Sequence, residues 1–118
     1  MTLDDVYKEL LVVASEAGTQ IDVPIESEQF FEGLLSGFSG SKDEFIEHVR
    51  ANIGEWFRCV GEGPRWIQEA EWQFHDGQPM VFLGQIDIPK SAGLFHDDAS
   101  VLAFLSPCGV TKNVIQVA

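Results

Sequence analysis

The sequence comprises 118 residues, of which 45% are apolar and 22% are charged. These values exclude a disordered chain, and the length predicts one hydrophobic core and therefore a single domain over residues 1–118. Seven basic residues against nineteen acidic ones give a net charge of −12. Because such a charge repels nucleic-acid phosphates and anionic membranes, we exclude both as partners and expect a basic protein partner.

The negative charge is concentrated in the first half of the chain. Residues 1–58 carry four basic and twelve acidic side chains (4 − 12 = −8), whereas residues 59–118 carry three and seven (3 − 7 = −4). Two interpretations are open: an acidic binding face, or a solvated surface that keeps the protein in solution.

The sequence predicts a cytoplasmic location. Three acidic residues lie among the first nine, where a secretory signal needs a basic start followed by an apolar stretch. The longest apolar runs, such as 101–105, are far shorter than the roughly 20 residues that cross a bilayer. Cys59 and Cys108 form no C-x-x-C pair, so we expect two reduced thiols and no zinc ribbon.

The first helix is predicted from Leu3 to Ala17, where apolar residues recur every three or four positions. Thr2 with Asp5 three residues later has the pattern of a capping box, and Gly18 provides an end. This is the first of about three helices that we expect in residues 1–60.

Two further segments complete the helical half. Residues 19–26, with Pro24 and alternating apolar positions, predict an extended connector or a short edge strand. We expect a second helix to start at Ser27 and to end at Gly37 or Gly40. Its apolar stripe consists of Phe30, Phe31, Leu34, Leu35 and Phe38.

A third helix is predicted from Ser41, which forms a capping-box pattern with Glu44. The helical period of apolar residues continues as far as Val60. Gly54 inside this segment costs about 1 kcal/mol relative to alanine, so a continuous helix and a break at Gly54 are both open.

The second half of the chain, residues 61–118, has the apolar spacing of strands. One hairpin is predicted from Trp72 through the turn 76–77 into a strand over 80–88, because Asp-Gly is a preferred hairpin turn. A second hairpin joins 101–105 to 110–117 across a Pro-Cys-Gly turn.

These elements predict an α+β domain in which about three N-terminal helices pack on one face of a four-stranded, mainly antiparallel sheet. The strand over 80–88 is apolar on both of its faces. We therefore expect this strand to be central in the sheet and covered on both sides.

The segment GPRWIQEAEWQFHDGQPMVFLGQIDIP and the later FHDDASVLAFLSP carry a distinctive order of motifs. A glycine-proline-x-aromatic-x-glutamine start, residues 63–68, is followed by a glycine-x-proline strand that ends in Gln85-Ile86-Asp87. In this order and spacing, residues 61–109 resemble the YwqG-like family and, more remotely, the programmed-cell-death-2/ribosome-synthesis chaperone proteins.

The resemblance implies a sheet-based module that binds proteins or peptides. Related eukaryotic proteins chaperone a ribosomal protein, and bacterial relatives are associated with toxin–immunity systems, so an immunity protein or a dedicated chaperone is implied. Neither role requires catalysis. The zinc-binding cysteines of the eukaryotic members are absent from this sequence, so the resemblance implies no metal site.

The candidate partner-binding residues come from both halves of the chain. We expect the acids of the second and third helices, among them Glu26, Asp43 and Glu44, to form one face that steers a basic partner. The loop over 89–100, with an aromatic anchor and polar strand residues, would then supply the shape-specific contacts. The candidates are Glu28, Glu32, Glu47, Trp66, Gln85, Asp87, His96 and Asp97.

Two of these candidates allow alternative roles. Gln85 and Asp87 project to the same side of their strand, where they line a groove or lie at an exposed strand end. The Gln85 amide is either paired inside the protein or in contact with a ligand. Trp66 is either a core residue or a peptide anchor.

An alternative function is a small metal-dependent hydrolase that uses His96 and Asp97. Consecutive side chains of an extended segment point in opposite directions, however, so His96-Asp97-Asp98 is more typical of a polar loop between two strands, with an aspartate capping a turn. No spacing fixes a catalytic pair among the nineteen carboxylates. We therefore expect no catalytic residue, metal or cofactor, and the sequence leaves the oligomeric state open.

Overall fold

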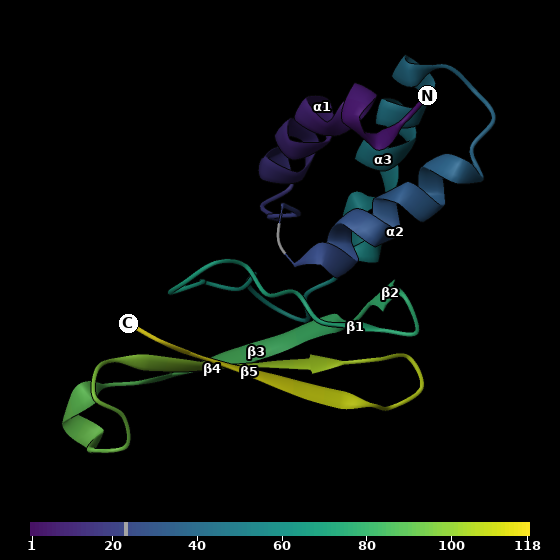
Figure 1. Ribbon diagram of the computed structural model, residues 1–118. Coiled ribbons are helices and arrows are strands. Elements are labelled where there is room, and N and C mark those ends of the chain that lie inside the picture. The colour runs from purple at the N-terminus through teal and green to yellow at the C-terminus, as the bar shows by residue number, and fades with distance from the viewer. Residues whose placement is uncertain (23) are drawn as a thin grey trace.

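The computed structural model of residues 1–118 describes every residue except Val23, and it confirms the α+β class (Figure 1). Three helices come first: α1 (Leu3–Glu16), α2 (Ile25–Ser36) and α3 (Lys42–Trp56). The rest of the chain contains β1 (Phe74–His75), β2 (Gln78–Pro79), β3 (Val81–Ile88), the 3-10 helix η1 (Lys90–Ala92), β4 (Ala99–Leu105) and β5 (Thr111–Val117). Among the described residues, no helix is both long and apolar enough to cross a membrane.

The start of α1 follows the sequence pattern and the start of α2 does not. The Thr2 N–H donates to the Asp5 carboxylate at 2.7 Å, as expected for the capping box. α2 begins at Ile25, so the prediction that Ser27 starts it is wrong. Pro24 precedes the helix with φ fixed at −77°, and its carbonyl accepts from the Ser27 N–H at 3.0 Å. Ser27 therefore lies inside the first turn.

The connector before α2 was predicted as an extended segment or an edge strand over residues 19–26. Val23 lies outside the described residues, and residues 19–22 and Pro24 form no strand. Ile25 and the residues after it belong to α2.

Helix α3 runs unbroken through Gly54, but it ends at Trp56 rather than at Val60. The residues beyond it are drawn into extended pairing with the sheet. The Phe82 N–H donates to the Arg58 carbonyl at 2.8 Å, and the Val60 N–H donates to the Phe82 carbonyl at 2.9 Å. Because Arg58 and Val60 use their backbone groups in this pairing, these residues cannot continue the helix.

The main sheet has three antiparallel strands in the order β3-β4-β5, and β1 pairs with β2 in a separate ladder of two residues. The prediction of four strands in one sheet is therefore wrong. Asp76 and Gly77 both have positive φ, 50° and 73°, as a tight type I′ turn requires. Beyond this pair the Met80 N–H still donates to the Gln73 carbonyl at 2.9 Å, and the chain then enters β3, which pairs with β4.

Strand β3 lies at the edge of the main sheet, not at its centre. Its free edge is paired only at the bridge between Phe82 and Cys59, and β4 is the central strand. Ile86 on its outer face is 68% exposed. The expectation of a central strand covered on both sides is therefore wrong, because no described helix of the bundle and no other strand lies over that outer face (Figure 1).

The helices do not pack directly on the sheet. Figure 1 shows the three helices on one side of the sheet, with the irregular segment after α3 and the β1–β2 hairpin between them and the strands. Gln85 and Gln116 project from the strands toward this segment and bond to its backbone. Their polar groups need partners, which the open backbone of a loop supplies and a helix, with its internal hydrogen bonds, does not.

An aromatic cluster around Phe57 joins the helical half to the strand half. Its ring centroid lies 6.0 Å from that of Phe30 and 6.1 Å from that of Phe31, both on α2. On the other side it lies 5.2 Å from Trp72 and 6.0 Å from Phe74. Phe57 is buried and is the first residue after α3, so it fixes the helix end against the hairpin.

We expect Phe57→Ala to lower the free energy of unfolding by about 3–5 kcal/mol, since it opens a cavity where both halves meet. Urea denaturation followed by circular dichroism measures this loss. Leu94→Ala, at a side chain that is 70% exposed, is the control and should change the value by less than about 0.5 kcal/mol. Equal stabilities for Phe57→Ala and the wild type would contradict the assigned role.

Candidate functional site

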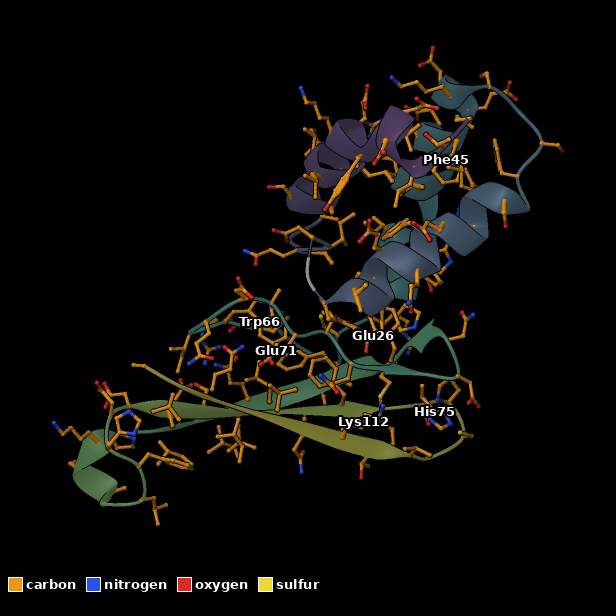
Figure 2. All side chains as sticks on the ribbon, viewed as in Figure 1. Glu26, Phe45, Trp66, Glu71, His75 and Lys112 are labelled. Atoms are coloured by element: carbon orange, nitrogen blue, oxygen red, sulfur yellow. The ribbon has the colours of Figure 1, made fainter. Side chains whose placement is uncertain are left out.

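Three of the predicted site residues, Trp66, Gln85 and Asp87, lie together around one open pocket of about 440 Å³ at an end of the sheet. The pocket lies between strands β3 and β4 and the segment over residues 64–71, which we call the strap. Figure 2 shows Trp66 and Glu71 on this segment, above the strands and below the helices.

The side-chain amide of Gln85 holds one end of the strap, because it forms hydrogen bonds with the strap backbone as a neighbouring strand would. Its Oε1 accepts from the Arg65 N–H at 2.9 Å, and its Nε2 donates to the Arg65 carbonyl at 2.9 Å. The same nitrogen lies 3.0 Å from Ser100 Oγ and 3.1 Å from Asp87 Oδ1. The amide is therefore paired inside the protein, which is the first of the two roles predicted for it.

Gln116 on β5 holds the other end of the strap in the same way. Its Oε1 accepts from the N–H groups of Ile67 and Gln68 at 2.8 and 3.0 Å, and its Nε2 donates to the Glu69 carbonyl at 2.7 Å. The side chain is only 1% exposed. Sequence reasoning missed Gln116, although its two-residue offset from the apolar Val114 places it on the inner face of the sheet.

Asp87 is the charged centre of the pocket. Its Oδ1 accepts from Ser100 Oγ at 2.6 Å, and its Oδ2 accepts from an Arg65 guanidinium nitrogen at 2.9 Å. The Ser100 hydrogen bond, followed by those of Arg65 and Gln85, lowers the pKa of the Asp87 carboxyl below its ordinary value. The carboxylate is therefore ionised at neutral pH.

Trp66 contributes the aromatic wall of the pocket. The ring is half-buried and is stacked on Phe104 of β4, with the two planes 15° apart and the centroids 6.4 Å apart. Trp66 thus packs on the core and also lines the pocket, which combines its two predicted roles. Ile88 and Pro89 add further apolar lining.

A second carboxylate, which the sequence did not identify as a site residue, lines the pocket at Asp98. Its Oδ1 accepts from the Lys90 N–H at 2.7 Å, so it also fixes the loop after β3. With Asp87 and Asp98 against Arg65, the pocket lining carries one net negative charge next to an indole ring. Such a lining suits a basic side chain, whose apolar stem packs on the ring and whose charge approaches the carboxylates.

The three helical glutamates, Glu28, Glu32 and Glu47, are not among the residues that line this pocket. Glu28 on α2 lies near Tyr7 of α1, where burial and then the charges of Asp22 and Glu28 raise the pKa of Tyr7. Glu32, one helical turn further along α2, lines a separate hollow beside Met1, Thr2 and Leu3.

Glu47 is an exposed residue of α3. It forms an ion pair with Arg50, and the Arg50 Nε lies 3.9 Å from a Glu16 oxygen on α1. A second ion pair, between Lys42 and Glu9 at 2.8 Å, joins the same two helices. That the acids of α2 and α3 form one face remains a prediction.

His96 and Asp97 lie in the loop between η1 and β4 and are not among the residues that line the pocket. His96 is exposed, and Asp97 Oδ1 accepts from the Asp98 N–H at 2.7 Å, a local turn contact. Within the part of the chain that the structure describes, no three His, Cys, Asp or Glu side chains are grouped as ligands of a metal ion.

Comparison with known proteins gives no family model, no curated protein and no solved structure that matches this chain.

Replacing Gln116 by leucine should lower the free energy of unfolding by about 2–4 kcal/mol, because it leaves two strap N–H groups and one carbonyl without partners. Thermal or urea denaturation measures the loss. Gln20→Leu is the matched control, since it makes the same substitution at an exposed position outside the strap and the sheet, and we expect it to be nearly neutral. A neutral Gln116→Leu would show that the strap does not depend on this amide.

Asp87 should stabilise the fold in a pH-dependent way. Its pKa is lower in the folded protein than in the unfolded chain, so its contribution is present above about pH 4 and is lost as pH falls through the folded pKa. The stability difference between wild type and Asp87→Asn should therefore be constant near neutral pH and shrink in acid. Ser100→Ala removes the shortest hydrogen bond to this carboxylate and should reproduce the trend. Urea denaturation from pH 7 to about pH 3 tests this, and a pH-independent difference would contradict it.

Proposed function

We propose that this chain is a cytoplasmic protein-binding domain whose partner presents a basic segment, and that the pocket beside the strap receives a lysine or arginine of that segment. The observation that carries the proposal is the pair of carboxylates, Asp87 and Asp98, beside the indole of Trp66 in one open pocket. A basic side chain is the group that this combination of charge and aromatic surface favours.

The charge of the whole molecule supports a basic partner. The net charge of −12 attracts cationic proteins over several ångströms, and this steering raises the rate of association at low ionic strength. The helical half, with its net charge of −8, contributes most of this field through exposed acids such as Glu28, Glu32 and Glu47. Steering needs only the summed field, so it does not require these glutamates to touch the partner.

The resemblance of residues 61–109 to the YwqG-like family supports the same class of function. Within that class, an immunity protein or a dedicated chaperone suits this chain, because nuclease toxins and ribosomal proteins are typically basic. The cytoplasmic location is part of the proposal and is supported by the two free thiols, since a reducing compartment keeps cysteines unpaired. No observation in the described structure favours the hydrolase alternative at His96 and Asp97.

A direct test uses two fluorescent peptides of equal length, one rich in lysine and arginine and one rich in glutamate. We expect wild-type protein to bind only the basic peptide and to lose affinity as salt is raised. Asp98→Asn removes one pocket charge but keeps an acceptor for the Lys90 N–H, and it should weaken binding by about fivefold. Fluorescence anisotropy measures both effects.

The matched control is Glu55→Gln, which removes the same charge at an exposed position of α3 outside the pocket lining. It should have a much smaller effect than Asp98→Asn. Equal losses for the two variants would show that binding follows net charge alone and does not use the pocket. Reversal of Glu28, Glu32 and Glu47 to lysine should slow association with the basic peptide and reduce its salt dependence.

A further inference from the structure

The outer face of the main sheet is apolar and carries no charge. Strand pairing places four cross-strand rows on this face, and the apolar members of the first three are Val81, Ile86, Val101, Ala103, Leu105 and Ile115. The fourth row, formed by Ile88, Ala99 and Val117, lies at the pocket end of the sheet, where Ala99 is buried. Thr111 and Asn113 are its polar members, and neither is ionisable. The only charged residues in the three strands, Asp87 and Lys112, bond to groups on the inner side of the sheet.

No helix of the bundle and no other described strand lies over this face, and the loop that contains η1 turns toward this side only at one end of the sheet (Figure 1). Figure 1 shows the sheet nearly edge-on, with the helices, the strap and the β1–β2 hairpin all on the other side. Ile86 is 68% exposed and Ile115 is 55% exposed, and the two lie in the same cross-strand row on either side of Val101. Leu83, in the bulge of β3, is 38% exposed at the border. A contiguous apolar patch of this kind marks an interaction surface.

We propose that two copies of this chain stack through their outer faces to form a two-fold symmetric β-sandwich. In such a dimer the row formed by Ile86, Val101 and Ile115 of one copy packs against the outer face of the other copy, and the two sheets lie about 10 Å apart. The proposal does not depend on the basic partner proposed above, because that partner approaches the opposite side of the sheet.

The distribution of charge favours a second copy over a basic partner on this face. A chain with 26 charged side chains (7 + 19) has none here, so the face offers no complementarity to a cationic protein. A second copy brings an equally uncharged face and leaves no charge buried at the contact. Stacking through the outer faces also keeps the acidic helical bundles at opposite ends of the dimer, where salt screens their repulsion.

The size of the face sets the strength of the dimer. Three strands of about seven residues measure roughly 23 Å by 14 Å from the usual rise and spacing of strands. Covering this face and its border on both copies would bury on the order of 1,000 Å², the lower limit for a specific interface. We therefore expect a reversible dimer with a dissociation constant on the order of 10–100 µM.

Salt distinguishes this contact from binding of a basic partner. Two copies that each carry a charge of −12 repel one another, so raising the salt concentration should strengthen the dimer severalfold. The basic peptide should respond in the opposite direction. Failure of one proposal therefore leaves the other intact, and the two are measured in separate experiments.

Sedimentation equilibrium of the full chain, from about 1 to about 300 µM, tests the dimer. Ile115→Asp introduces a charge in the row of Ile86, Val101 and Ile115 twice per dimer, and we expect it to raise the dissociation constant more than tenfold. Val12→Asp is the matched control, because Val12 lies on α1 with the same 55% exposure and outside the face. It should leave the dissociation constant within about twofold of the wild type.

Ile115→Thr is a second variant for the case that Ile115→Asp does not fold, since threonine is favourable in a strand and removes only part of the apolar contact. Circular dichroism verifies that both variants are folded, and we expect Ile115→Thr to weaken the dimer by about three- to tenfold. A wild-type chain that stays monomeric over the whole range overturns the proposal, even if the face then captures another protein or a lipid vesicle. A dimer that Ile115→Asp and Val12→Asp weaken equally also overturns it.

Discussion

Two glutamine amides, the buried one of Gln116 and the half-buried one of Gln85, determine what covers the inner face of the sheet. Gln85 and Gln116 project from strands β3 and β5 into a largely apolar layer, where an unpaired amide would cost several kcal/mol. The backbone of the strap, residues 64–71, supplies the missing donors and acceptors. A loop therefore lies directly on the strands, and the helices are displaced to the far side of that loop.

This displacement creates the candidate site. Because the strap follows the sheet for only a few residues and the helices lie beyond it, the end of the sheet near Asp87 and Asp98 stays open to solvent. The same hydrogen bonds that hold the strap also orient the pocket, since Gln85 contacts both Asp87 and the Arg65 backbone. Stability and site geometry thus share one polar network, and a change in either glutamine is expected to affect both.

The protein has two surfaces of opposite character on either side of one thin sheet. The inner side carries the pocket and the acidic helical bundle, and the outer side carries an uncharged apolar face. Long-range electrostatics can therefore act on one side while apolar packing acts on the other, without burying unpaired charge. A dimer through the outer face would present two identical pockets, which increases the effective concentration of sites for a partner with repeated basic residues.

The sequence by itself determined the local elements, because helix caps, apolar spacing and turn residues act over only a few positions. The capping boxes before α1 and α3, the turn at Asp76 and the β4–β5 hairpin are examples. Pairing between residues far apart in the chain decided three other features. These are the position of β3 at the edge of the sheet, the residue at which α3 ends, and the segment that covers the sheet. Gln116 contacts the strap 48 or 49 residues away, and no local pattern reports such a hydrogen bond. For the same reason Trp66, Gln85 and Asp87 could be selected as candidates from the sequence, whereas Asp98 and Gln116 became visible only once the strands were paired.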